Sequence, residues 1–174
     1  TSSLVLGLIL GVMMASDLGG PINKAAYLFA VGGLERGGAV NQEIMAAVII
    51  SGMVPPLAMA LATTLRPKLF TEENGKAAWL LGASFISEGA IPFASADPLR
   101  VISSSVVGGA LAGAISMSAH VASPAPHGGI WIVLLSNNVL MFLVAVAAGT
   151  LLSALVYLVL KSIGAASKAE KVAA

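Results

Sequence analysis

Charged residues and cysteines are what this sequence lacks. Of its 174 residues only 10% are charged, 9 Lys and Arg against 8 Asp and Glu, and there is no Cys. A soluble domain carries roughly 25% charged residues, so these charges are too few to cover a soluble globule. The absence of cysteine excludes disulfides, zinc–thiolate sites, iron–sulfur clusters and a cysteine nucleophile. With 57% hydrophobic residues and a mean hydropathy of +0.95, the composition indicates a protein of the lipid bilayer.

Other classes of partner and ligand are also disfavoured by the sequence. The net charge is +1 and the basic residues are scattered, so we expect no nucleic-acid partner. The sequence contains no P-loop and no cluster of metal ligands, so we expect neither a metal nor a cofactor. The chain starts at Thr1, and its first apolar run has no basic leader of the kind that a secretory signal carries. We therefore expect the chain to be part of a longer protein.

Three stretches free of Asp, Glu, Lys and Arg approach or exceed the ~20 residues of a spanning helix. They are residues 1–16, 44–65 and 101–160. Pro55-Pro56 lies in the middle of the second stretch and predicts a kink or a break there. The third stretch is long enough for two or three crossings, of which residues 140–160 are the clearest.

The segments between these stretches do not span. Residues 66–76 hold five of the seventeen charges and predict an extramembrane loop, and residues 161–174 predict a polar tail that we expect to be disordered. Residues 77–87 are apolar but too short to cross, and a charge and a Gly/Pro turn follow them, which predicts a re-entrant hairpin. Residues 121–129 (VASPAPHGG) form a second break.

These segments predict an all-α polytopic membrane protein with about four or five spanning segments plus re-entrant hairpins. Residues 1–160 would form part of a transport domain, and residues 161–174 its tail. Because both the 66–76 loop and the tail are rich in Lys and Arg, the positive-inside rule places them, and therefore the C-terminus, on the cytoplasmic side.

Glu88 is the strongest candidate for a functional residue. A carboxylate within a hairpin at membrane depth costs about 2.5–3.5 kcal/mol, so it needs a polar cavity or a partner. A transporter would use it to accept hydrogen bonds from ligand hydroxyls. Gly89, which follows it, favours unwound backbone that lines a cavity. The structural alternative is an ion pair with Arg100 or Lys24.

Four other polar residues are weaker candidates. Asn23 would contact a ligand if residues 17–24 (DLGGPINK) line the cavity, and Asp17 closes the preceding apolar run. His127 lies in the second break and could donate to a sugar or phosphate oxygen. Asp97, just before Pro98, fits a helix N-cap that pairs with Arg100, which is a structural role.

Three segments carry a resemblance to a known family. They read MMASDLGGPINK at 13–24, SEGAIPF at 87–93 with ADPLRV at 96–101, and APHGG at 125–129. Together and in this order they resemble the membrane component EIIC of fructose-type phosphoenolpyruvate-dependent sugar phosphotransferase systems. The resemblance implies a homodimeric multi-pass permease of the bacterial inner membrane that carries fructose or a related sugar.

In that family a phosphocysteine on a partner EIIB domain, itself supplied through EIIA, phosphorylates the sugar. The resemblance implies that Glu88 holds the sugar hydroxyls and that His127 is a second polar contact. From the residues themselves we expect that Glu88 could also take the hydroxyl proton as a general base, with Asn23, Asp17 and Gly89 as further substrate-binding residues. A chain without Cys has no phosphoryl carrier, so it would be the membrane subunit of a protein-phosphocysteine–sugar phosphotransferase. Two alternatives stay open: an ion-coupled secondary transporter that uses Glu88 and Asp17, and a membrane scaffold that transports nothing.

Overall fold

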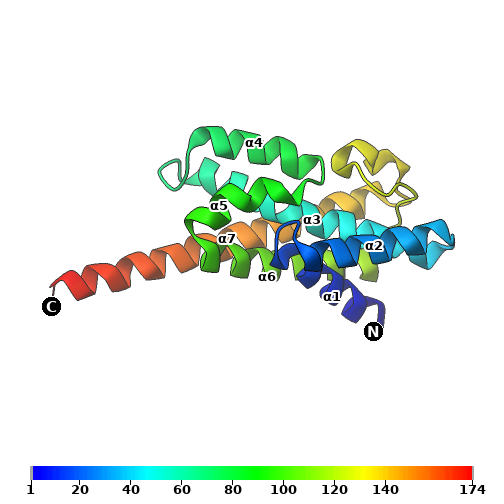
Figure 1. The fold of residues 1–174 in the computed structure, drawn as a ribbon, viewed down its shortest axis with the longest axis horizontal. Helices are drawn as coiled ribbons and strands as arrows, with labels where there is room; N and C mark the ends of the chain where they lie inside the picture. Colours follow the sequence, from blue (N-terminus) through cyan, green and yellow to red (C-terminus); the bar gives the residue numbers. More distant parts are fainter. Residues whose placement is uncertain (1, 174) are drawn as a thin grey trace.

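The computed structural model describes the backbone of residues 2–173 and the side chains of residues 2–165, and every regular element in these ranges is a helix. The elements, including two short 3₁₀ helices η1 and η2, follow each other as α1 (Ser2–Ser16), α2 (Pro21–Glu35), α3 (Ala39–Leu65), α4 (Glu72–Ala83), η1 (Ser87–Ala90), α5 (Ile91–Ala96), α6 (Pro98–Ser118), η2 (Gly129–Leu135) and α7 (Val139–Ala173). Figure 1 shows them as an elongated bundle around α3. The predicted all-α class is confirmed.

Among the residues that the structure describes, three helices are long and apolar enough to cross a membrane. They are α3, α6 and the Val139–Ala165 part of α7, and α1 is a shorter apolar helix. Along α3 94% of the most apolar stretch is buried, whereas in α7 only 33% is buried, so α7 turns large apolar side chains outward. In a bilayer such an exposed apolar face contacts lipid or further helices. The predicted polytopic membrane protein is confirmed.

Small residues let the helices of the bundle approach closely. A Cβ built on Gly11 would collide with the carbonyl of Gly109, and one built on Gly108 with the carbonyl of Gly149. Backbones that touch in this way gain dispersion contacts that larger side chains would prevent. Gly7 likewise touches Gly113, and Arg100 donates to the Leu160 carbonyl, so α6 runs antiparallel to both α1 and α7.

The helix α3 runs unbroken through Pro55 and Pro56, so of the predicted kink or break the break does not occur. A proline in a helix interior removes an N–H, so the carbonyl four residues earlier loses its partner. Here the surrounding helices bury that turn of α3 completely, and the carbonyl of Gly52 receives another donor, described below. Tertiary packing therefore keeps the helix continuous where propensity alone predicts interruption.

The two predicted breaks elsewhere are present. After α4 the chain turns at Phe85, which has a φ of +61°, and continues through η1 and α5, neither of which is long enough to span. Residues 121–128 are non-helical and lead into η2. Both irregular segments contact α3, the most buried span of the bundle: η1 and η2 pack against it, and the Ser123 N–H donates to the Gln42 carbonyl at 3.0 Å.

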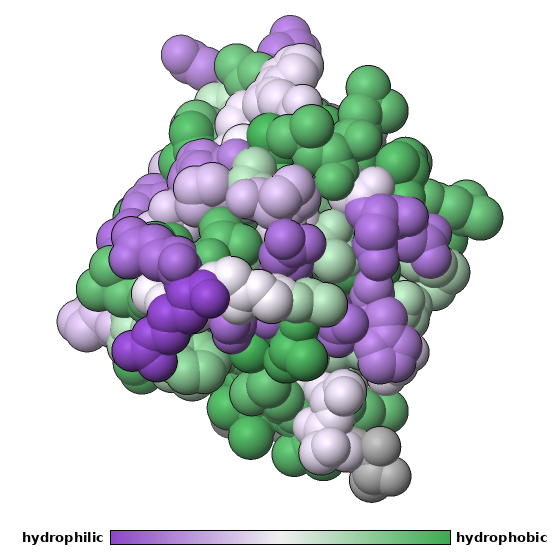
Figure 2. Space-filling model, turned by 90° about the vertical axis from the view of Figure 1, so that its right-hand side faces the viewer, coloured by the Kyte–Doolittle hydropathy of each residue, from purple (hydrophilic) through white to green (hydrophobic). Residues whose placement is uncertain are grey.

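The segment 66–76 and the last turns of α7 lie at the same end of the molecule. The Arg66 guanidinium donates to the Ser162 hydroxyl at 3.2 Å, and both segments lie at the left in Figure 1. Figure 2 shows the opposite end, where hydrophilic side chains gather between hydrophobic ones. The predicted tail at 161–174 starts inside α7, and side chains beyond residue 165 lie outside the described residues.

Candidate sugar-binding site

Three of the predicted site residues line one cavity. Asn23 on α2, Glu88 in η1 and His127 in the 121–128 loop are brought together around a space of about 140 Å³. The remaining lining residues are Lys24, Tyr27, Phe85, Ile86 and Ser87. The cavity therefore gathers side chains from three segments that are far apart in the sequence.

The cavity lies level with the middle of α3. The Ser87 hydroxyl donates to the carbonyl of Gly52 at 2.8 Å, and Gly52 is halfway along the 27-residue helix. At ~1.5 Å per residue α3 is about 40 Å long, against a hydrocarbon core of about 30 Å. Glu88 is thus next to the centre of α3, a 27-residue candidate span, at the depth where transporters place their substrate sites.

Glu88 forms an ion pair with Lys24. The Lys24 ammonium donates to Oε1 of Glu88 at 3.0 Å, and the two side chains are 56% and 43% exposed, so both face the open cavity. Of the two partners that the sequence suggested, Lys24 is therefore the one in contact. Gly19, with a φ of +100°, packs on the same carboxylate, and a Cβ there would lie 2.5 Å from Oε1.

Asn23 and Asp17 hold the turn between α1 and α2. The Asn23 amide donates to the carbonyl of Met14 in the last turn of α1 at 2.7 Å. The Asp17 carboxylate accepts from the backbone N–H groups of Ile22 at 2.7 Å and Asn23 at 3.0 Å, and so caps the start of α2. Asn23 lines the cavity while it does this, whereas Asp17 lines a separate hollow against α5 and α6.

His127 is exposed and lies against aromatic rings. Its ring centroid is 5.0 Å from that of Phe85 and 6.4 Å from that of Tyr27. The other histidine, His120, lies outside the cavity, with Nδ1 3.1 Å from the Glu43 carboxylate. Gly89 is buried and packs against Leu81 rather than lining the cavity.

Sequence reasoning missed four lining residues, Tyr27, Phe85, Ile86 and Ser87. Tyr27 follows Asn23 by four positions, so a helix starting at Pro21 would have placed both on one face. Ser87 precedes Glu88 directly, but nothing in the sequence shows that its hydroxyl reaches α3. Phe85 depends on a left-handed turn that a bulky residue adopts rarely, so no local signal identifies it.

A larger hollow of about 340 Å³ lies apart from this site, between the ends of α3 and α4. Its charged lining residues, Glu72 and Lys76, form an exposed i,i+4 pair, and Trp79 donates to the Thr64 hydroxyl. It opens at the end of the bundle rather than beside the middle of a span. We therefore assign the candidate site to the Glu88 cavity, where polar side chains converge.

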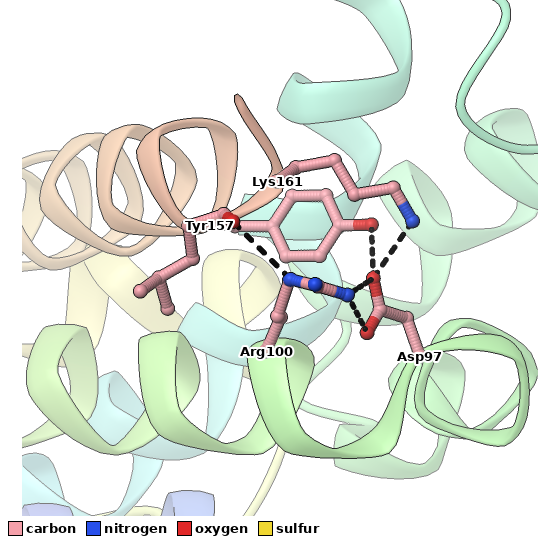
Figure 3. Close-up of polar contacts among 5 residues, drawn as sticks. Asp97, Arg100, Tyr157 and Lys161 are labelled. Carbon is pink, nitrogen blue, oxygen red and sulfur yellow. Dashed lines mark hydrogen bonds and ion pairs between the residues drawn. The ribbon is translucent and has the colours of Figure 1, made fainter. Parts of the chain in front are cut away.

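A second charged cluster joins the start of α6 to α7 (Figure 3). The Asp97 carboxylate, 9% exposed, accepts from Arg100 at 3.0 Å and from Lys161 at 2.8 Å, and the Tyr157 hydroxyl lies 3.4 Å away. Asp97 is at the N-cap position before Pro98, but its side chain makes no capping hydrogen bond, because it is engaged with these cations. Burial raises the pKa of Asp97, but the hydrogen bonds and charges of Lys161 and Arg100 lower it by more.

Comparison with known proteins identifies close relatives. Over 162 residues the chain is 50% identical to the "PTS system fructose-specific EIIC component" of Haloferax volcanii, which covers 91% of this chain and 42% of that protein. It is 51% identical over 166 residues to the fructose-specific EIIB'BC component of Escherichia coli (92% and 29%), and 44% identical over 165 residues to the fructose permease IIC component of Bacillus amyloliquefaciens (92% and 53%). The predicted resemblance to fructose-type EIIC is confirmed.

The chain spans about half or less of the length of these relatives. Some relatives carry EIIB, or EIIA and EIIB, in the same polypeptide as EIIC, as their names EIIB'BC and EIIABC state. No protein-family model matches the chain, and no solved structure matches it. The relatives thus support the fructose-type EIIC assignment by sequence similarity.

Proposed function

We propose that this chain binds fructose or a related sugar and carries it across the bacterial inner membrane as part of a phosphotransferase permease. The observation that carries the proposal is the convergence of Glu88, Asn23 and His127 on one cavity beside the middle of α3. The fructose-specific names of the relatives support the choice of sugar.

The cavity has the chemistry that a sugar needs. A carboxylate accepts hydrogen bonds from hydroxyl groups, and an ammonium or amide donates to them. Glu88 can therefore accept from the sugar hydroxyls, and Lys24 and Asn23 can donate to the hydroxyl oxygens. Phe85 and Tyr27 offer apolar faces to the C–H surface of the ring. The cavity is smaller than the about 300–1,000 Å³ of drug-sized sites, which favours a small ligand.

Phosphorylation would need a partner, because the chain has no Cys. In the proposed step a sugar hydroxyl oxygen attacks the phosphorus of a phosphocysteine on EIIB. The new O–P bond forms as the S–P bond breaks, and the thiolate leaves. Glu88 would accept the proton of the attacking hydroxyl, and the cavity contributes by positioning that hydroxyl. EIIA would rephosphorylate EIIB.

The proposal extends to assembly and orientation. We propose that the permease is a homodimer in the lipid bilayer, with the end that carries Arg66 and Lys161 facing the cytoplasm. Both cations lie at one end of the bundle, as the positive-inside rule requires for a cytoplasmic face. EIIB would then approach from that end.

The alternative of an ion-coupled transporter that uses Glu88 and Asp17 is less well supported. Such a site needs carboxylate oxygens that are free for the ion. Both oxygens of Asp17 accept backbone N–H groups at the start of α2, and Asp17 does not line the Glu88 cavity. The fructose-specific names of the relatives also favour the sugar.

The test is Glu88→Gln in the complete permease. Gln keeps the shape but loses the charge, and a charge-assisted hydrogen bond contributes roughly 1.5–3 kcal/mol against roughly 0.5–1.5 for a neutral one. We expect a loss of about 1–2 kcal/mol per affected hydroxyl, or roughly 5- to 30-fold weaker fructose binding. Binding is measured by titration in detergent, together with the expression level.

Glu73→Gln serves as the matched control, because Glu73 is exposed and lies outside the cavity. It should leave fructose affinity unchanged. Wild-type affinity of the Glu88→Gln permease at normal expression would remove Glu88 from the sugar site and refute the proposed mechanism.

A further inference from the structure

The segment that carries Glu88 docks on a single turn of α3, residues 52–56. Every second residue of the segment, at positions 85, 87 and 89, makes the contact. The Phe85 ring covers Gly52 so closely that a Cβ on Gly52 would collide with it, and a Cβ on Gly89 would lie 3.2 Å from Cβ of Pro56. Between them Ser87, which is only 4% exposed, donates its hydroxyl to the Gly52 carbonyl at 2.8 Å.

Pro56 explains why that carbonyl is available. In an α-helix the carbonyl of residue i accepts from the N–H of residue i+4, and for Gly52 that residue is Pro56, which has no N–H. Without another donor the carbonyl would be buried and unsatisfied, which is unfavourable. Ser87 therefore fills a hydrogen-bonding position that the helix itself cannot fill.

The geometry of this contact also fixes Glu88. Ser87 is held against α3 on one side, and the next side chain, Glu88, extends toward Lys24 and the cavity. Gly19 closes the remaining space on the carboxylate. A shift of Ser87 away from α3 would move Glu88 relative to Asn23 and Tyr27, which belong to α2.

We propose that Ser87, hydrogen-bonded to the Gly52 carbonyl that Pro56 leaves free, is the positioning residue that holds Glu88 in place for the sugar. This inference rests on the proposed role of Glu88 in sugar binding. It assigns a function to the proline in the middle of α3 and to the serine before the glutamate, and it makes the two residues interdependent.

The experiment compares Ser87→Ala with the double variant Ser87→Ala/Pro56→Ala in the complete permease. Ser87→Ala leaves the Gly52 carbonyl without a donor, so both the melting temperature and fructose affinity should fall, the affinity by roughly 2- to 12-fold, the range of one neutral hydrogen bond. In the double variant the alanine that replaces Pro56 supplies the helical N–H, so the melting temperature should recover. Fructose affinity should stay low, because Ser87 no longer ties Glu88 to α3.

Ser116→Ala is the matched control. Ser116 is a fully buried serine in α6 whose hydroxyl has no hydrogen-bond partner, so its removal should leave fructose affinity unchanged. Recovery of both affinity and melting temperature in the double variant would show that Ser87 acts only through stability and would overturn the inference. Wild-type affinity of Ser87→Ala would also overturn it. If Ser87→Ala does not fold, the double variant alone decides.

Glu88→Gln, measured in parallel, separates this inference from the proposed function. If Glu88→Gln loses affinity while Ser87→Ala keeps it, the positioning role fails and the sugar site stands. If Glu88→Gln keeps wild-type affinity, the sugar site itself fails, and the positioning inference fails with it.

Discussion

Replacing Asp97 by Asn should loosen the junction between α6 and α7. Asp97 is the acceptor for two cations, Arg100 and Lys161, and is buried apart from 9% of its side chain (Figure 3). Asn offers one acceptor oxygen where Asp offers two, and its uncharged amide no longer attracts the two cations, so we expect a loss of about 1 kcal/mol for each cation. Both cations are 37% exposed and can be hydrated in the variant, which reduces the loss. We expect about 1–2 kcal/mol of destabilisation.

The assay is thermal unfolding of the purified protein in detergent. For a protein of this size 1 kcal/mol shifts the melting temperature by roughly 2–4 °C, so Asp97→Asn should lower it by about 2–8 °C. Glu72→Gln breaks the ion pair with Lys76, whose two side chains are 80% and 74% exposed, and should cause almost no shift. Equal shifts for the two variants would refute the reasoning that burial makes the Asp97 cluster important.

The pH dependence of the Asp97 effect follows from its pKa. Because the pKa of Asp97 is lower in the folded protein than its ordinary 3.8, the cluster contributes stability above that pH and loses it as the pH falls through the folded-state value. The difference in melting temperature between wild type and Asp97→Asn should therefore be constant near neutral pH and shrink only below about pH 4. A difference that already disappears near pH 6 would contradict this assignment.

Two further predictions concern the Glu88 site and the topology. Gly19→Ala should weaken fructose binding in titration, because a Cβ there meets the Glu88 carboxylate at a φ of +100°, whereas Gly32→Ala, with open space around it, should not. A single cysteine in place of Asn74 should react with an impermeant thiol reagent only after the cells are permeabilised. A single cysteine in place of Ala39, the first residue of α3, should react in intact cells. The reverse pattern would overturn the proposed orientation.

The composition and the charge-free runs were sufficient to predict the fold class. Lipid exposure requires that every backbone group be satisfied inside the chain, so long apolar runs leave the helix as the only choice. The glycines at 7, 11, 109 and 113 lie where α1 and α6 touch, because backbones can approach so closely only where side chains are absent. No prediction covered α2, since it is too short to span and carries polar residues at both ends.

The candidate site was predicted in part. Glu88, Asn23 and His127 do converge, because each stands in a Gly- or Pro-rich interruption of an apolar run, and interruptions inside a bundle line cavities. Asp17 stands in the same kind of sequence but caps α2 instead. A carboxylate that binds a ligand and a carboxylate that caps the next helix occur in the same kind of local sequence. Only the contacts of the carboxylate oxygens, which in Asp17 accept backbone N–H groups of α2, distinguish the two roles.

Pro56 is a second residue whose local sequence pattern does not determine the structure around it. Its sequence context predicts a kinked or broken helix, yet α3 is continuous, and the Gly52 carbonyl that Pro56 leaves free has another donor. That donor, Ser87, is distant in the sequence. Local propensity therefore identifies where a backbone group is left without a partner, whereas tertiary contacts decide whether the helix breaks.

The site as a whole lies where regular helix hydrogen bonding stops. The carbonyl of Met14 in the last turn of α1 is satisfied by Asn23, and the carbonyl of Gly52 in α3 by Ser87. In both cases the side chain that satisfies the helix belongs to the cavity lining. A polar ligand at the centre of a membrane needs polar groups there, and each such group needs a partner of its own; Glu88 and Lys24 pair with each other, whereas Asn23 and Ser87 bond to the backbone. Asn23 and Ser87 thus serve both the cavity and a helix carbonyl that lacks a helical partner, which is why binding and packing are hard to separate here by single substitutions.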